Sequence, residues 1–368
     1  MRQELLRKRF GQKVQLTFHC QIITPMFLGD AFQDAALRPE PFKGLLRYWW
    51  RVAVGRKAKD HEELLEEETL LFGGGGEKAQ KSFVTVEVEG EPQIITSQNL
   101  PKVDNVRHPE VSRPVNPLLY LGYGPIIWQR GSGPIYNRFY FAPRSEFQIK
   151  ISFPKSLWED EDFKTAIKCF CAFGAVGSRS RNGWGSFQLR KVEPKELEEQ
   201  ILSHKIPCLW FNEKLFGERD YPHTLALDKV IRKPLLWRTK KFYETWQDVM
   251  KHLAEIYIPC RTSLPPDRQD DIDERHLLGF PLTHHPANRA PNWGPRARHA
   301  SPLRFFVRKK KKGYLGFILH LPFGISKRMR RNASGKIFFT PNKQFEIWQK
   351  VHQCLDEAMQ RASINECL

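Results

Sequence analysis

Acidic side chains are missing from a long part of the C-terminal half of this 368-residue chain. No Asp or Glu occurs between Glu274 and Glu346, a stretch of 71 residues that carries 16 Lys or Arg. Solvated protein surfaces normally mix both signs of charge, so a long stretch of one sign favours a polyanionic partner. The whole chain has the same bias, with 59 Lys and Arg against 41 Asp and Glu and a formal net charge of +18.

Several other features are absent, and each absence argues against a class of protein. No apolar run approaches the roughly 18 residues that a membrane-spanning helix needs. No apolar segment follows the basic residues 1–13, as it would in a secretory signal. The Gly-x-x-x-x-Gly-Lys-Ser/Thr motif of mononucleotide-binding loops is also missing. These observations predict a cytoplasmic protein with no membrane partner.

Cysteine is scarce and odd in number, with seven residues and no Cys-x-x-Cys pair. This usage favours reduced thiols over a secreted disulfide framework. One set of side chains could be considered as zinc ligands: Cys260, His276, His284 and His285. Its spacing matches no familiar zinc site, so we expect neither a metal nor another cofactor.

The most informative segment of the chain is a strand pattern followed by a basic helix. Residues 14–22 alternate apolar and polar side chains, as in a strand with one buried face, and Thr24 and Pro25 end the pattern. Pro39 and Pro41 suit the start of a helix, where a missing N–H costs little. At helical spacing, the apolar side chains that follow form one face: Leu45, Leu46, Trp49, Val52 and Ala53.

The opposite face of this helix combines cations with an indole. On spacing alone, an ordinary solvated face and a binding face are about equally supported. Trp50 favours binding, because a large indole on a polar face gains little unless a base or sugar stacks on it. We therefore predict that Trp50 stacks on RNA and that three cations hold phosphates: Lys43, Arg47 and Arg51.

A glycine-rich segment at 174–185 contains four glycines and two arginines, and it follows a strand pattern and a helical pattern. Glycine permits a backbone to approach a ligand closely, although it also serves tight turns. Arginine side chains in such a loop can meet phosphates. We predict that Arg179 and Arg181, together with Arg38 from the loop before the basic helix, line one groove.

The order of elements over residues 12–190 is strand, helix, strand, strand, helix, strand, which is the ferredoxin-like order. An acidic helix is predicted around 62–68. Chain length and a charged stretch near Pro194 predict two domains, 1–192 and 193–368. In the second domain, helices are expected at 241–256 and 341–361, and strands at 303–307 and 314–320.

Two basic clusters in the second half have two interpretations of similar weight. The run 308–312 lies between two apolar strands, and the cluster 326–331 follows them. Each is either a solvated turn or a contact with RNA. The candidate contacts are Lys309, Lys310, Arg328 and Arg330.

These segments resemble the RAMP superfamily of CRISPR effector proteins. The residues at 24–29, 38–39 and 43–51 are similar to the subunit-one family of the Cmr, or type III-B, complex. The similarity is densest at 22–51 and 72–74, is clear again at 174–187, and thins in the second half to 278–282 and 299–304. The resemblance implies two ferredoxin-like domains in an α+β fold, each an antiparallel sheet with helices on one face. It also implies a non-catalytic role and contact with RNA near the 3′ region of the guide, which is the CRISPR RNA. The implied partners are CRISPR RNA, single-stranded target RNA and other Cmr subunits.

Two alternatives remain open. Relatives in this superfamily cleave RNA with a histidine-centred site, so an endoribonuclease that processes guide RNA is the first, with His19 as candidate. Asp30 and Asp34, in the loop before the basic helix, are the only carboxylates we would test for metal-dependent cleavage. The second alternative is a structural subunit that only bridges neighbouring proteins.

Overall fold

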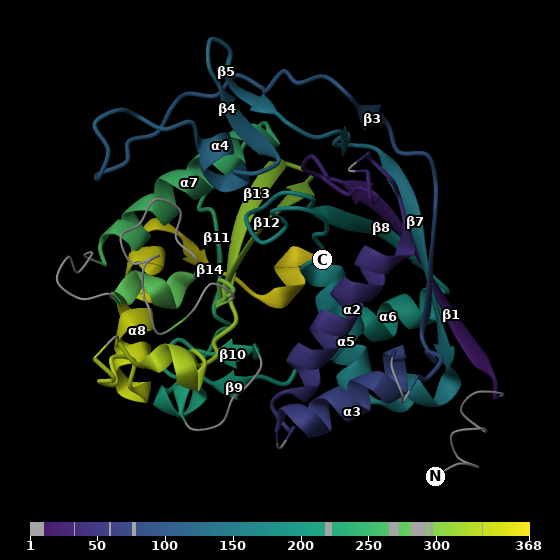
Figure 1. Cartoon of the computed structure of the whole chain (residues 1–368). Coiled ribbons are helices and arrows are strands. Elements are labelled where there is room, and N and C mark those ends of the chain that lie inside the picture. The colour runs from purple at the N-terminus through teal and green to yellow at the C-terminus, as the bar shows by residue number, and fades with distance from the viewer. Residues whose placement is uncertain are drawn as a thin grey trace.

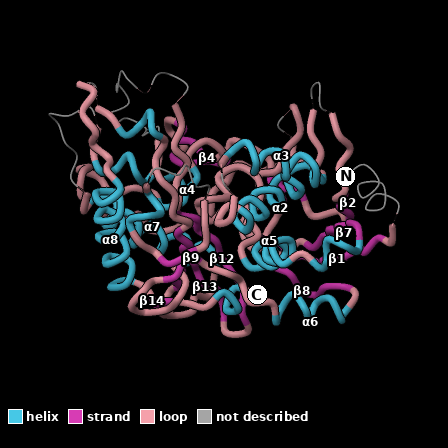
Figure 2. Tube along the Cα trace, turned by 90° about the horizontal axis from the view of Figure 1, so that it is seen from below, coloured by secondary structure: helices cyan, strands magenta, loops and turns pink. Residues whose placement is uncertain are grey.

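Two four-stranded antiparallel sheets form the frame of the chain (Figure 1). The computed structural model describes residues 11–32, 34–58, 60–75, 79–217, 223–264, 272–280, 293, 297–332 and 334–368. Viewed from below, the helices of the first sheet lie at one end and those of the second at the other (Figure 2). The predicted α+β class with antiparallel sheets is confirmed.

The first sheet has the strand order β2-β7-β1-β8. Helices α2 and α5 pack against each other, and buried side chains of both share one apolar core with the sheet. In chain order the elements are β1 (Lys13–Ile22), α2 (Pro39–Val54), α3 (His61–Phe72), β2 (Thr85–Glu89), β7 (Glu146–Pro154), α5 (Glu161–Ala172) and β8 (Phe187–Glu193). Without the short α3, this is the predicted ferredoxin-like arrangement.

The second sheet repeats this arrangement with the order β12-β13-β11-β14. Its elements are β11 (Leu236–Arg238), α7 (Trp246–Thr262), β12 (Leu303–Lys310), β13 (Gly313–His320), α8 (Pro341–Ala358) and β14 (Gln360–Arg361). The expected helix at 241–256 begins too early, because Thr245 caps α7 by accepting a hydrogen bond from the Asp248 amide. The division at 192/193 falls within the last residues of β8, and the two-domain division itself stays a prediction.

Shorter elements fill the connections. An insertion between β2 and β7 contains β3 (Ile94–Ile95), α4 (Pro117–Gly122), β4 (Ile126–Gln129), β5 (Gly133–Tyr136) and β6 (Tyr140–Phe141). Other connections contain η1 (Lys155–Glu159), α6 (Lys195–Ser203), β9 (Leu209–Trp210), η2 (Glu213–Phe216), β10 (Ala226–Leu227), η3 (Glu274–Leu278), η5 (Lys327–Arg330) and η6 (Ile364–Cys367). No described helix is long and apolar enough to cross a membrane.

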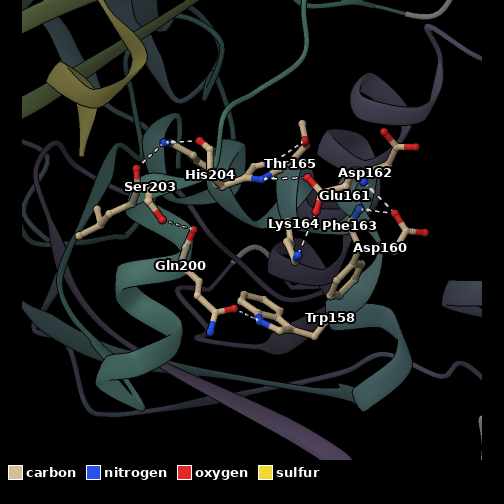
Figure 3. A network of polar contacts seen from close by, with 12 residues as sticks. Trp158, Asp160, Glu161, Asp162, Phe163, Lys164, Thr165, Gln200, Ser203 and His204 are labelled. Atoms are coloured by element: carbon tan, nitrogen blue, oxygen red, sulfur yellow. Dashed lines mark hydrogen bonds and ion pairs between the residues drawn. The ribbon is translucent and has the colours of Figure 1, made fainter.

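A polar network attaches α6 to η1 and α5 (Figure 3). The Trp158 indole donates to Gln200 Oε1 at 2.6 Å, and Thr165 Oγ1 lies 2.8 Å from His204 Nε2. Buried Lys168 donates to the carbonyl oxygens of Leu202 and His204 at 2.7 and 2.8 Å, so it caps the end of α6. The chain leaving β8 is thereby held against the first sheet.

The two sheets meet along β12. The Phe305 amide donates to the Arg181 carbonyl oxygen at 2.7 Å, and the Val307 amide donates to Ser186 Oγ at 3.1 Å. Two residues further, the Lys309 amide donates to Gln188 Oε1 at 2.9 Å. An edge strand of the second sheet is therefore paired with the end of the glycine-rich segment and the start of β8.

Arg308 lies at the centre of this junction with no exposed surface. Its guanidinium donates to the carbonyl oxygens of Ala172 at 2.7 Å, Val307 at 2.9 Å and Cys367 at 3.1 Å. Burial lowers its pKa to about 10. The interpretation of residues 308–312 as a hairpin tip is wrong for Arg308, because β12 continues to Lys310 and only Lys311 and Lys312 form the turn.

The cysteines depart from the expectation of seven reduced thiols. Cys260 of α7 and Cys354 of α8 form a disulfide, with Cα atoms 5.6 Å apart, and the other five are free. Cys260 is therefore no zinc ligand, while His284 and His285 lie outside the described residues. Within the described ranges, no group of three metal-ligating side chains is found.

We expect Arg308→Met to lower the free energy of unfolding by roughly 2–4 kcal/mol. Three buried carbonyl oxygens would lose their donor at about 1–3 kcal/mol each, partly offset because no charge is then desolvated. Urea unfolding followed by circular dichroism measures the change, with Lys311→Met in the exposed turn as the matched control. Equal stability of the two variants would contradict the role assigned to Arg308.

Candidate nucleic-acid interface

The predicted binding face of α2 is partly covered by α3. Trp50 is only 5% exposed and packs edge-on against Phe72, with ring centroids 5.9 Å apart. The prediction that Trp50 stacks on RNA is therefore wrong. The indole belongs to the apolar core because α3 folds back over this side of α2, which helical periodicity of α2 alone cannot indicate.

Arg47 and Arg51 face the same helix and share one acidic partner. The Glu68 side chain, only 3% exposed as a residue, accepts from Arg47 Nε at 2.7 Å and from Arg51 Nε at 2.7 Å. Asp60 fixes the start of α3, since its carboxylate accepts from the amides of Glu62 and Glu63. Both arginines therefore neutralise a buried carboxylate, and their predicted phosphate contacts stay untested.

Two other predicted cations keep accessible positions. Arg38 is exposed at the residue preceding α2, and Lys43 is partly exposed on its first turns. Burial and the charge of Arg47 lower the pKa of Lys43. Next to it, Gly44 is exposed, and a Cβ there would meet no atom within 4 Å. This part of α2 is open to a ligand.

The glycines of the 174–185 segment serve the packing of the chain itself. A Cβ at Gly185 would lie 1.8 Å from the Val176 carbonyl oxygen, and one at Gly177 would lie 2.4 Å from that of Phe27. The expectation that these glycines admit a ligand is wrong. Arg179 also forms a contact within the protein, because its Nε donates to the Tyr123 carbonyl oxygen.

Arg181, by contrast, joins a group of side chains from three separate elements. Its guanidinium carbon lies 6.0 Å from the Tyr48 ring centroid, and that of Arg304 lies 4.6 Å from the same centroid. Arg304, on β12, also lies 5.2 Å from the Trp49 ring and is only 6% exposed. We call Arg181, Arg304 and Tyr48 the cation cluster.

The cation cluster carries positive charge without a compensating carboxylate among the described residues. Burial lowers the pKa of Arg181, and the charge of Arg304 adds to this effect. The Tyr48 hydroxyl lies 2.5 Å from His223 Nδ1, and burial followed by the two guanidiniums lowers the His223 pKa well below its usual value. Burial also lowers the pKa of His299, to about 4. Both imidazoles are therefore neutral at pH 7. An anion would relieve the repulsion between the guanidiniums.

The remaining predicted contacts lie on the second sheet and in η5. Lys310 Nζ donates to the Leu368 carbonyl oxygen at 2.6 Å. Arg330 donates to the carbonyl oxygens of Ile325 at 3.0 Å and Gly217 at 2.8 Å, so it holds local structure. Lys309 is partly exposed beside the Tyr314 ring, and Arg328 lies in η5. RNA contacts by these four residues stay predictions.

The candidate catalytic residues are not assembled into a site. His19 lies on β1 with Nε2 3.7 Å from Glu193 of β8. Asp30 Oδ1 accepts from the amides of Phe32 and Asp34, which shapes the loop before α2. No third metal-ligating side chain joins Asp30 and Asp34 in the described part of the chain.

Sequence patterns missed Arg304, Tyr48, His223 and His299 as members or neighbours of the cluster. Tyr48 lies between the predicted cation Arg47 and the core residue Trp49, so its role depended on which face α3 covers. The available signal for Arg304 was its position in the acid-free stretch after Glu274. Only pairing of β12 with the glycine-rich segment brings it to α2.

Comparison with known proteins identifies the first part of the chain. Residues 19–188 match the sequence model of the RAMP superfamily. This region belongs to the RAMP superfamily. It includes the end of β1, the whole of α2 and the glycine-rich segment, so the RAMP region supplies Tyr48 and Arg181 of the cation cluster, while Arg304 lies beyond it.

Solved structures with a similar arrangement cover nearly the whole chain. A chain of the type III-B Cmr-beta complex bound to cognate target RNA and AMPPnP, in the presence of ssDNA, shares 13% identity; the match covers 94% of this chain and 100% of that one, with a TM-score of 0.50. Cmr1 from Pyrococcus furiosus in its apo form shares 17% identity over 90% and 96% of the two chains, with a TM-score of 0.43. No curated protein sequence matches the chain. The Cmr-beta likeness shows that the fold extends beyond the RAMP region.

We expect the double variant Arg47→Ala with Arg51→Ala to have a lower free energy of unfolding than wild type. A broken, fully buried ion pair typically costs about 3–5 kcal/mol, and the loss here should be smaller because both arginines are partly exposed. The unpaired carboxylate of Glu68 causes the loss, so adding Glu68→Leu should restore most of it. Thermal unfolding of the double and triple variants measures this. A double variant as stable as wild type would show that the Glu68 pairs contribute nothing.

Proposed function

We propose that this chain is a non-catalytic RNA-binding subunit of a type III-B, or Cmr, CRISPR effector in antiviral defence. In this proposal it contacts guide or target RNA near the 3′ region of the guide, and its partners include other Cmr subunits. The cation cluster carries the proposal, because two partly desolvated guanidiniums without a described carboxylate form a site for a phosphate. Arginine presents a planar fork that suits phosphate geometry.

Membership of the first part in the RAMP superfamily supports this proposal, as does the likeness to a Cmr-beta chain whose complex is bound to cognate target RNA. Arg38 and Lys43 add accessible positive charge at the start of the helix that carries Tyr48, beside the exposed backbone of Gly44. Contacts to phosphate carry no sequence information. The proposed binding is therefore to single-stranded RNA with little sequence preference.

The chemistry of the cluster favours binding over cleavage. Cleavage by acid and base needs a proton acceptor and a donor within hydrogen-bond reach of the reacting oxygens. Near the cluster, the Tyr48 hydroxyl and His223 Nδ1 are already paired with each other, and His299 Nε2 lies 3.1 Å from the Leu277 carbonyl oxygen. The proposed function assigns these imidazoles to packing and orientation of the cluster.

We expect Arg181→Gln with Arg304→Gln to weaken binding of labelled single-stranded RNA by about tenfold or more, since hydrogen bonds to charged groups contribute about 1.5–3 kcal/mol each. The slope of log affinity against log salt should fall by up to about two units, one per lost phosphate contact. Fluorescence anisotropy at several salt concentrations measures both. As a control, Lys155→Gln with Lys195→Gln removes the same amount of charge from exposed positions elsewhere. An equal loss of RNA affinity in both double variants would mean that net charge alone, and not the cation cluster, causes the effect.

Gly44→Ala separates stability from binding. Alanine in a helix interior is favoured over glycine by about 0.8–1.0 kcal/mol, so the fold should become more stable. RNA affinity should fall, because the added methyl lies on the open face of α2 one turn from Tyr48. Unchanged affinity in the stabilised variant would place the RNA away from this helix.

We expect no cleavage of guide precursor or target RNA by the chain, with Mg²⁺ or with chelator. A histidine acid or base normally contributes about 10²–10⁴-fold to rate, so cleavage by a histidine-centred site should nearly vanish in His19→Ala. Gel analysis of labelled RNA checks this. Metal-independent products lost in that variant, or metal-dependent products lost on changing Asp30 or Asp34, would refute the non-catalytic assignment.

A further inference from the structure

A cavity of about 560 Å³ runs along one face of α8, on the second sheet's side of the molecule. Phe345, Gln349, Gln353 and Asp356 line it at helical spacing, so it follows about three turns of the helix. The facing wall is the turn after β10, which includes Val230. We call this feature the α8 groove.

The floor of the α8 groove is aromatic. Phe211, which follows β9, lies 4.9 Å from the Phe345 ring and 4.7 Å from the His352 ring, measured between centroids. Phe211 and His352 are 5% and 4% exposed, so the floor is fixed by packing. A preformed apolar floor in a cavity of this size is typical of a binding site.

The mouth of the groove presents an apolar side chain to solvent. Val230 is 90% exposed, and its neighbour Ile231 is 42% exposed. The turn that carries them is held by Asp228 Oδ1, which accepts from both of their amides at 2.9 Å. The valine is therefore presented by an ordered turn beside an aromatic floor. An apolar centre with a polar rim is the composition of a protein–protein interface.

The charges of the groove are opposite in character to those of the cation cluster. Arg361 binds Asp356 Oδ1 at 2.5 Å and Asp228 Oδ2 at 3.4 Å, which ties the two walls together and neutralises part of their charge. Glu357 is exposed, and its carboxylate accepts a 3.4 Å hydrogen bond from the Gln353 amide and forms no ion pair among the described side chains. The Lys240 ammonium donates to the Glu357 backbone carbonyl oxygen at 2.6 Å and leaves the carboxylate oxygens open. Lys229 is the remaining cation of the lining. The lining therefore holds three carboxylates and two cations in a chain of net charge +18, so it suits an incoming cation better than a phosphate.

We propose that the α8 groove docks a neighbouring protein subunit. The docking segment inserts an apolar side chain over Phe211 and Phe345, against Val230, and places a Lys or Arg beside Glu357. This inference rests on the proposed function for the existence of neighbouring subunits, but it uses none of the residues assigned to RNA. The chain would then bind protein through the second sheet's helix and RNA through the junction of the sheets.

Two variants test the docking in the assembled complex. The full-length chain, as wild type, Val230→Asp or Glu357→Lys, is co-expressed with the other subunits of its own effector and purified through a tag on another subunit. We expect each variant to be retained about tenfold less than wild type, as for an interface anchor that contributes about 1.4 kcal/mol or more. Leu65→Asp on α3 and Glu159→Lys in η1 make the same changes at exposed positions elsewhere and should be retained normally.

The affinity of each free chain for single-stranded RNA is measured in parallel and should stay within about twofold of wild type. Neither Val230 nor Glu357 belongs to the cation cluster. Normal retention of both groove variants overturns the docking proposal. Reduced RNA affinity with normal retention would assign the groove to RNA. A wild-type chain that binds RNA but is retained by no subunit overturns the docking, whereas one that is retained but does not bind RNA refutes only the RNA-binding role.

A photo-crosslinking residue at position 230 identifies the occupant directly. In the assembled complex, we expect it to attach to a peptide of a neighbouring subunit that contains an apolar residue near a Lys or Arg. Mass spectrometry of the crosslinked peptide reads this out. A crosslink to RNA, to a second copy of this chain, or to an acidic peptide would overturn the proposal.

Discussion

The buried guanidinium of Arg308 is the interaction on which the arrangement of the two sheets depends. It reaches from the second sheet to the carbonyl oxygen of Ala172 at the end of α5, and to that of Cys367 near the end of the chain. A desolvated cation is costly unless its donors are satisfied, and here carbonyl oxygens, including one at a helix C-terminus, satisfy them. Displacement of β12 would leave this charge and its acceptors unpaired, so one position of the strand is strongly favoured.

The alternation of β12 then decides which side chains the first sheet's helices meet. Arg304, Phe306 and Arg308 share one face, and Phe306 packs against Phe173 with ring centroids 5.6 Å apart. Phe305 and Val307 point to the other face and enter the core around α7. Because Arg308 fixes the register, Arg304 is placed over Tyr48 and Trp49 of α2. The cation cluster is thus a consequence of the same contact that joins the sheets.

Many cations of this basic chain hold the fold together and are not free for a partner. Arg47 and Arg51 neutralise Glu68, and Arg179 donates to a backbone carbonyl oxygen. Arg181 and Arg304, which have no acidic partner among the described residues, lie where three elements converge. Net charge therefore predicts a polyanionic partner, while the sequence alone does not show which cations are available to bind it.

Local sequence patterns determined the order of strands and helices, the start of α2 at its prolines and the ferredoxin-like topology, since period and turn chemistry act over a few residues. They also singled out Arg181 as a candidate RNA contact, which stays a prediction. Contacts between distant segments decided the rest. Trp50 became core because α3 lies across α2, the glycines of 174–185 were required by the backbone of Phe27 and Val176, and Arg304 reached α2 only through strand pairing. Residues far away in the sequence decide which side of a helix faces solvent and which cation has no acidic partner. Only the tertiary structure shows these neighbours.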